Sequence, residues 1–477
     1  MSAVLAERIT QEHAAAAGAL PSSVVSSERR RSAVEALSAK GLPTTRDENW
    51  KYANLRPVEK VKFSPASGAG VGLSAADLPP AISGYARYVF VDGRFAAELS
   101  ATGSPAGVTV KAAASSVATA VNAAIRRESS IAGSDGLKSA SPVSSHTISS
   151  TTNSPATISP INVFSAVAPG AHPDERFALL NDAFATDGAR IHAPQGANCT
   201  ACVEILFIAT EPGQSAASYP RLEMEVEANA RIGLIERHAS TGNDANFVNG
   251  AVTVNIGAGA QVDHFRVQQA GARATWIDTL TATVEKGARY CLHSVNIGAL
   301  SARSTMRVQL VGERAETAIH VVSLADGQQV HDAFALVEHI APNTKSDQSV
   351  RGIAAGRGRV AFNSKVVVRE HAKGTDSKQS LRGLLAGDQS EIDVRPQLEI
   401  YTDDVRCNHG ATAGKLDDNM LFYMLSRGVE REIAQQLLKW AFLEDVVSRI
   451  AVPELRRQIE LSLAGQLKET AALKELL

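Results

Sequence analysis

The chain has 477 residues, in which 48 Lys and Arg balance 50 Asp and Glu, and it contains four cysteines. This length exceeds the roughly 250–300 residues at which a single hydrophobic core stops growing, so two or three domains are expected. The balanced charge predicts neither a nucleic acid nor an anionic membrane as partner, and four cysteines are too few for a disulfide framework in so long a chain.

Residues 1–124 are predicted to form an N-terminal domain of helical or mixed structure. Helical spacing is clearest in SSERRRSAVEALSAKGLP (26–43), where Gly41 and Pro43 would stop the helix. Two acidic residues among the first twelve argue against a signal or transit peptide, and no apolar run reaches the roughly 20 residues of a membrane helix. A cytoplasmic location without membrane insertion is therefore expected.

Two aromatic residues, Trp50 and Tyr52, stand among charges in RDENWKYANL (46–55). One interpretation is a docking strand or loop with aromatic anchors. The other is that both side chains pack on their own domain.

A Ser-, Thr- and Pro-rich tract at 125–160 has almost no aromatic residues. Such a composition buries too little apolar surface to offset the entropy of ordering the chain, so this tract is predicted to be a poorly ordered insertion. Residues 161–189 are expected to be a helical connection, with helix resuming around FALLNDAFATDG (177–188).

The segment 190–412 carries short alternating runs such as LEMEVEA, VTVNIGA and LTATVEK, which predict strands. A small residue before the next run recurs at intervals of 30, 28, 27, 43 and 32 residues, and the equivalent positions are Ala230, Ala260, Ala288, Ala315, Gly358 and Ser390. An imperfect period near 30 favours a single-chain β-solenoid, or β-helix, over a jelly roll or a Greek-key sandwich.

Residues 413–477 change to three amphipathic helices. Asp417 or Asp418 would cap the first helix, Gly428 would end it, and Pro453 suits the first turn of the last. The second helix has an apolar stripe that packs on its own domain or leaves part of its surface to a partner helix or groove. The members of that stripe considered for partner binding are Trp440, Phe442 and Leu443.

No enzyme motif stands out. GATAGKL (410–416) departs from a phosphate-binding loop, because three residues separate its glycines and Leu416 follows the lysine, so this chain is not expected to bind nucleotide. Cys199 and Cys202, with His192 nearby, form a single CxxC that is weak support for a metal site.

Two Cys/His pairs have a spacing of two residues, which puts both side chains on one face of a strand. Cys291 with His293 reads as core more readily than as a ligand pair. Cys407 with His409 lies in the polar segment DDVRCNHGAT (403–412), where a nearby cation or helix N-terminus would favour the thiolate. Metal ligation completed by a partner, a structural role and a nucleophilic cysteine remain open for this second pair.

Two segments resemble the SufD family, the scaffold subunit of the SUF iron-sulfur cluster assembly complex in the SufB/SufD superfamily. They are RDENWKYANL (46–55) and LEIYTDDVRCNHGATAGKLDDNMLFYMLSRGV (398–429), and residues 361–401 are similar to the last coils of that family. The resemblance implies a mainly β protein, with a right-handed parallel β-helix core flanked by N-terminal and C-terminal α-helical domains.

The same resemblance implies a function. The chain would be a non-catalytic scaffold that pairs with the paralogue SufB, β-helix to β-helix, and binds the ATPase SufC through its C-terminal helices, including Trp440, Phe442 and Leu443. A nascent, transient iron-sulfur cluster would form at the SufB/SufD interface, where His409 and Cys407 would be ligands, and the complex would aid iron acquisition. ATP hydrolysis would belong to SufC.

Alternative interpretations differ in class. The chain is also similar in architecture to SufB, although the N-terminus has no cysteine and CNHGAT (407–412) lacks the acidic form of that motif. A β-helix polysaccharide-acting enzyme would need recurrent acids on one face of the solenoid, which the repeat does not show. In isolation, a homodimer through an exposed sheet edge is expected.

Overall fold

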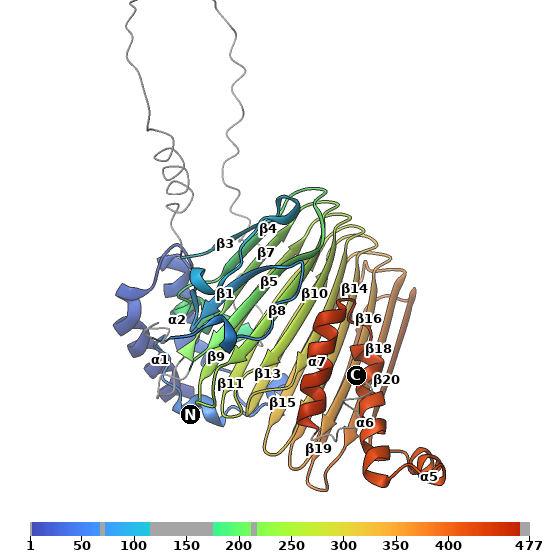
Figure 1. Cartoon of the computed structure of the whole chain (residues 1–477). Helices are drawn as coiled ribbons and strands as arrows, with labels where there is room; N and C mark the ends of the chain where they lie inside the picture. Colours follow the sequence, from blue (N-terminus) through green and yellow to red (C-terminus); the bar gives the residue numbers. More distant parts are fainter. Residues whose placement is uncertain (1, 67–71, 115–174, 211–216, 468–477) are drawn as a thin grey trace, which may run out of the picture.

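A computed structural model describes residues 2–66, 72–114, 175–210 and 217–467 (Figure 1). The chain forms a parallel β-solenoid of about seven turns, with helices at its N-terminal and C-terminal ends. This confirms the predicted fold class. The predicted insertion at 125–160 lies outside the described residues, as does the first part of the predicted connection at 161–189.

Each coil of the solenoid contributes one strand to each of two facing sheets. The front sheet has the order β2-β1-β5-β8-β10-β12-β14-β16-β18-β20, and the back sheet has the order β19-β17-β15-β13-β11-β9-β7-β4-β3, with β6 paired to β9. The front strands are β1 (Ala86–Val91), β2 (Arg94–Phe95), β5 (Asn198–Ala209), β8 (Arg231–Ser240), β10 (Gln261–Gln269), β12 (Arg289–Asn296), β14 (Glu316–Ala325), β16 (Lys345–Ala354), β18 (Thr375–Leu385) and β20 (Val405–Gly414). The back strands are β3 (Thr109–Ala112), β4 (Ala189–Ala193), β6 (Ala217–Ser218), β7 (Arg221–Val226), β9 (Phe247–Ile256), β11 (Thr275–Val284), β13 (Ser301–Leu310), β15 (Val330–His339), β17 (Arg359–Val368) and β19 (Glu391–Ile400).

The predicted repeat corresponds to the corner before each front strand. A residue with positive φ stands at each of these corners, and the small residue of the repeat follows it: Asn229, Gly259, Gly287 and Arg314 precede Ala230, Ala260, Ala288 and Ala315. These four small residues are fully buried, because the chain turns inward there. The last two predicted positions, Gly358 and Ser390, instead precede back strands, which explains the irregular step of 43 residues.

Register along the front sheet shows the true period in the last coils. Glu316, Lys345, Asp376 and Arg406 are aligned, at steps of 29, 31 and 30 residues. The solenoid interior is aliphatic over most of its length and includes Leu234, Val262, Leu292, Val321 and Val350. The alternating pattern therefore has its expected cause, since every second side chain of a strand points inward.

The N-terminal helices pack against the outer face of the back sheet. They are α1 (Ser2–Ala16), α2 (Ser27–Lys40) and α4 (Arg176–Phe184), and α4 contacts β9 and β11. Trp50 is fully buried in this layer, with its ring 5.2 Å from that of Phe177, so it packs on its own domain as one interpretation expected. The short 3-10 helices are η1 (Ala17–Ala19), η2 (Glu48–Trp50), η3 (Arg56–Lys60), η4 (Ala75–Asp77), η5 (Ala97–Leu99) and η6 (Pro105–Gly107).

The C-terminal helices follow β20, and the last two of them fold back onto the outer face of the front sheet (Figure 1). They are α5 (Asp418–Ser426), α6 (Arg431–Val447) and α7 (Pro453–Gln466). The predicted signals hold: the Asp417 side chain accepts hydrogen bonds at the start of α5, Gly428 has φ 81° after it, and Pro453 opens α7. Helix α6 contacts β14 and β16, whereas α5 extends away from the sheet beyond the end of α6.

Candidate functional site

The candidate site lies at the C-terminal end of the solenoid. There β20 pairs with β18 and β19 pairs with β17, and within the described residues neither β19 nor β20 has a partner on its other edge. Backbone N–H and C=O groups are thus exposed along two adjacent strand edges, which are templates for pairing with another chain.

Cys407 and His409 lie on β20, on the strand face that continues the solenoid interior. Cys407 is in register with Ser377 and His409 with Gln379, and both of these β18 residues are buried inside. Cys407 is half-buried against the interior core, whereas His409 is exposed. The expectation that the pair shares one face of an extended strand is confirmed.

In the coils that precede this pair, the solenoid interior changes from aliphatic to polar. The Oγ atoms of Ser346 and Ser377 are 2.9 Å apart behind Cys407. Behind His409, Gln379 Nε2 donates to Ser364 Oγ at 2.6 Å, and Ser364 Oγ donates to Gln348 Oε1 at 2.5 Å. The half-buried thiol and the exposed imidazole therefore lie over buried polar side chains.

The thiol of Cys407 is not activated within this chain. Partial burial raises its pKa above the ordinary value, the carboxylate of Asp376 adds to this, and a hydrogen bond with the backbone of Ser377 only partly opposes it. The expected stabilisation of the thiolate is therefore wrong for the isolated chain. A metal ion or a cationic partner group would have to displace the proton.

One buried histidine next to this polar region predicts a pH effect on stability. Burial lowers the pKa of His339 from 6.5 to about 4, and its ring nitrogens lie 2.8 and 2.9 Å from the Oγ atoms of Thr344 and Ser346. His339 takes up a proton near pH 6.5 in the unfolded chain but only near pH 4 in the folded chain. The free energy of unfolding therefore decreases as the pH falls from 6.5 to 4. We expect the free energy of unfolding, measured by denaturant titration between pH 7 and 4, to depend less on pH in His339→Gln than in wild type. The two slopes should differ by up to about 1.4 kcal/mol per pH unit. Parallel curves would contradict this role of His339.

The three predicted partner residues of α6 lie in different environments. Leu443 has no exposed surface and belongs to the core between α6 and the front sheet, whereas Trp440 and Phe442 are partly buried at the margin of that core. A partner could reach Leu443 only after α6 had left the sheet. A contact role of these residues stays a prediction.

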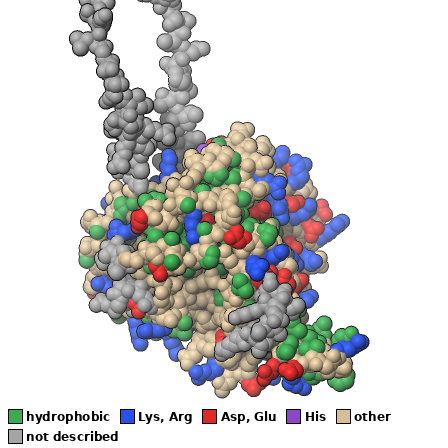
Figure 2. All heavy atoms as spheres, viewed as in Figure 1, with side chains coloured by type: hydrophobic (Ala, Val, Ile, Leu, Met, Phe, Trp, Pro, Cys, Tyr) green, Lys and Arg blue, Asp and Glu red, His purple; other side chains and the backbone are tan. Residues whose placement is uncertain are grey.

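A larger exposed apolar surface lies on α5, which was not among the predicted partner-binding positions. Met420, Phe422 and Tyr423 are exposed, Phe422 by 72%. Figure 2 shows these hydrophobic side chains gathered on the protruding helix. The signal was present in DNMLFYMLS (418–426), where apolar residues occupy more positions than one buried face of a short helix needs.

Among the described residues, the CxxC motif does not belong to any group of three potential metal ligands. Cys199 and Cys202 are buried on β5 of the front sheet, while His192 on β4 of the back sheet is paired with Glu227 at 3.0 Å. In the described part of the chain, three potential metal ligands converge elsewhere, at Cys291, His293 and His320.

Comparison with known proteins assigns the chain to a family. Residues 207–442 match the family model described as the SUF system FeS cluster assembly, SufBD core domain. The chain belongs to the SufBD family of iron-sulfur cluster assembly proteins. It is 27% identical over 421 residues to the iron-sulfur cluster assembly protein SufD of Escherichia coli, with 88% of each chain covered.

Two further proteins are similar to this SufBD family chain. A SufBD family protein of Synechocystis is 26% identical over 443 residues, covering 90% of this chain and 89% of its own. The chloroplastic protein ABCI7 of Arabidopsis thaliana is 26% identical over 298 residues, covering 61% and 63%. No helix in the described ranges combines the length and apolar character needed to cross a membrane.

Proposed function

We propose that this SufBD family chain is a cytoplasmic, non-catalytic scaffold that acts as the SufD-type subunit of a SUF complex. In this proposal SufB continues the solenoid at the β19/β20 end, SufC binds the C-terminal helices, and the assembly aids iron acquisition. A nascent iron-sulfur cluster forms between the two solenoids as cargo of the complex. The 27% identity to a SufD protein along 88% of both chains supports the SufD-type role over the SufB-like alternative.

One observation carries this proposal: an incomplete ligand pair stands on an open solenoid end. Cys407 and His409 project from the last strand, and in the described residues they do not belong to any group of three potential ligands. Iron in a cluster needs more ligands than one thiolate and one imidazole. A second solenoid paired to β20 would bring its own ligands to the same place.

The environment of the pair suits a cluster that must be released. His409 is exposed and Cys407 only half-buried, so a shared cluster would be closed off mainly by the partner. Movement of the partner would then remove ligands and admit solvent in one step. The buried polar side chains of Ser377 and Gln379, next to Cys407 and His409, would offer hydrogen bonds to the bound cluster.

The SufC contact is proposed to centre on α5 and the margin of α6. Met420, Phe422 and Tyr423 present an exposed apolar face, and Trp440 and Phe442 lie at the margin of the α6 core with part of their surfaces accessible. Aromatic residues and methionine are enriched in protein interfaces, so this surface fits a helix-binding groove. When SufB is absent, the open β20 edge would instead pair with a second copy of this chain.

The test is anaerobic co-purification of the tagged full chain with SufB and SufC, measuring complex composition, iron and acid-labile sulfide together. For His409→Ala we expect both partners to be retained and iron and sulfide to fall several-fold, because a ligand is lost while the strand edge is unchanged. For Phe422→Asp we expect SufC alone to be lost.

Matched controls make the result specific. His371→Ala changes another exposed histidine and should leave composition and cluster content unchanged. Normal iron and sulfide in His409→Ala would refute the ligand role. Failure of wild type to retain SufB or SufC would refute the scaffold assignment itself.

A further inference from the structure

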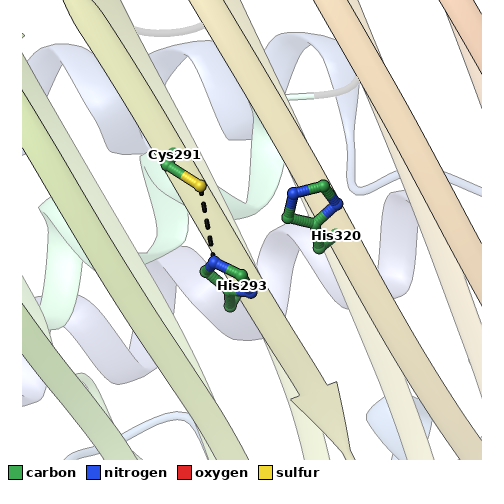
Figure 3. A group of neighbouring side chains, drawn as sticks. All are labelled: Cys291, His293 and His320. Atoms are coloured by element: carbon green, nitrogen blue, oxygen red, sulfur yellow. Dashed lines mark hydrogen bonds between the residues drawn. The ribbon is translucent and has the colours of Figure 1, made fainter. Parts of the chain in front are cut away.

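A second group of soft ligands lies on the opposite face of the front sheet from the interior. Cys291 and His293 are two residues apart on β12, and His320 is directly opposite His293 on β14. All three side chains are buried, and one ligand atom from each lies within 4.8 Å of the others (Figure 3). This group is separate from Cys407 and His409, which face the interior.

The distances resemble those of a tetrahedral site. Cys291 Sγ and His293 Nε2 are 3.4 Å apart, and two such ligands on one Zn²⁺ are separated by about 3.5 Å, given bond lengths of about 2.3 and 2.0 Å. The rings of His293 and His320 have centroids 4.9 Å apart. The three ligand atoms lie within 4.8 Å of one another, so the His320 nitrogen would move inward to reach the separation of about 3.5 Å that a tetrahedral ion requires.

The protonation states leave both imidazoles free to coordinate. Burial lowers the pKa of His293 to about 3 and that of His320 to about 4, so both rings are neutral near pH 7. Burial raises the pKa of Cys291 to about 12, so its thiol is protonated near pH 7, and its Sγ lies 3.4 Å from His293 Nε2. A metal ion would replace this proton and bind the thiolate it leaves behind.

We propose that Cys291, His293 and His320 form a binding site for one borderline-soft divalent metal ion, with Zn²⁺ as the preferred occupant. One thiolate and two imidazoles are a ligand set that suits Zn²⁺, and Zn²⁺ stands above Fe²⁺ in the general order of affinities. Nothing in the proposed cluster-scaffold function requires this site.

His320 reaches the site through one nitrogen. Its Nδ1 lies 3.5 Å from Arg449 Nη1 on the α6 side, and Figure 3 shows its other ring nitrogen turned toward Cys291 and His293. On binding, the ring proton would pass to Nδ1, and Arg449 would give up this long contact. Arg449 also donates to Ser349 Oγ at 3.1 Å and to the Asp445 carbonyl at 3.1 Å, so it keeps partners.

A cavity lies on the same face of the front sheet as the three ligands, and Ser349, which lines it, is directly opposite His320. A cavity of about 410 Å³ between the front sheet and α6 is lined by Asp347, Ser349 and Arg449, among others. Asp347 is opposite Ala318, the small residue that lies between it and Cys291 in the same cross-strand row. Asp347 is not among the groups whose ligand atoms converge with the other three, so water would occupy the fourth position of the ion.

The experiment uses the full chain purified without added metal, stripped with a chelator and titrated with Co²⁺ and then Zn²⁺. We expect one Co²⁺ per chain with a thiolate-to-cobalt charge-transfer band, which Zn²⁺ then abolishes by displacement. An anaerobic titration with Fe²⁺ gives the affinity ratio of the two ions. Cys291→Ser should remove the band and weaken Zn²⁺ binding by at least about 100-fold, because a ligand contributes no less than its outer-shell partners do.

Three variants show whether the band arises at this site. Cys202→Ser removes another buried thiol, and Cys407→Ala with His409→Ala removes the proposed cluster ligands, so both should retain the band in full. Arg449→Met should strengthen Zn²⁺ binding, because it removes a cation that competes for His320. Absence of the band in wild type, or its persistence in a Cys291→Ser protein that melts cooperatively, would overturn the proposal.

Discussion

Replacing Arg266 by methionine is expected to cost about 3–5 kcal/mol of folding free energy, because two carboxylates would be left buried without a counter-charge. The Arg266 guanidinium lies in the solenoid interior and donates to Glu236 at 3.0 and 2.9 Å and to Asp278 at 2.5 Å. Burial disfavours the charge on Glu236, yet Arg266 and the hydrogen bonds from His238 and His264 hold its pKa well below the ordinary value. Urea unfolding followed by circular dichroism and tryptophan fluorescence measures the loss.

The control for Arg266 is Arg359→Met, which breaks an ion pair of similar length at the surface. Arg359 Nη2 and Glu391 Oε1 are 2.6 Å apart, but the two side chains remain 44% and 49% exposed. Solvent screens such a pair, so a loss of at most about 1 kcal/mol is expected. Equal losses in the two variants would show that burial does not set the strength of the interior network.

Truncating Leu443 to alanine is expected to cost about 2–5 kcal/mol at the seam between α6 and the front sheet, because a cavity would remain where the buried side chain was. The leucine packs among Val322, Leu324 and Ile353 of the sheet's outer face. Hydrogen exchange measured by mass spectrometry should show faster exchange in α6 and α7, with β7 to β11 unchanged.

Leu461→Ala is the matched comparison, since Leu461 is 45% exposed on α7 and its truncation should change exchange little. If Leu443→Ala left the exchange of α6 at the wild-type rate, the helix would not depend on this contact. If exchange in α6 does rise, loss of the proposed partner SufC in Leu443→Ala would report displaced helices rather than a direct contact.

The repeat predicted the solenoid because its cause is local. Each coil needs a turn with positive φ followed by a small inward residue, and this leaves a mark in the sequence. Thr344 and Thr375 replace alanine at the repeat position of the coils that contain β16 and β18, so the repeat is harder to recognise there. The positions predicted for these coils, Gly358 and Ser390, precede strands of the back sheet instead.

The chemistry was only partly predictable for a different reason. Alternation indicated that Cys407 and His409 share a face, but no pattern within this strand could show that β20 is the last strand of its sheet, which leaves His409 exposed. The sequence did contain a signal for His320 as a neighbour of His293, although it was not recognised. His320 follows Ala315 by five residues, as His293 follows Ala288, so the two histidines occupy equivalent positions of the repeat. Which apolar stripe remains exposed, that of α5 or that of α6, depends on how the helices dock and cannot be read from either helix alone.

The return of the chain from β20 to α6 has a consequence for the durability of the open end. A stack of coils ordinarily frays from its last member, because that member has a neighbour on one side only. Here the chain that leaves β20 is tied back onto β14 and β16, and the ion pair between Arg351 and Asp445 fastens it there. Peeling of the terminal coil would therefore release a segment still held at both ends, which gains less conformational entropy than a free end would. The terminal strand edge can therefore stay folded before another chain pairs with it.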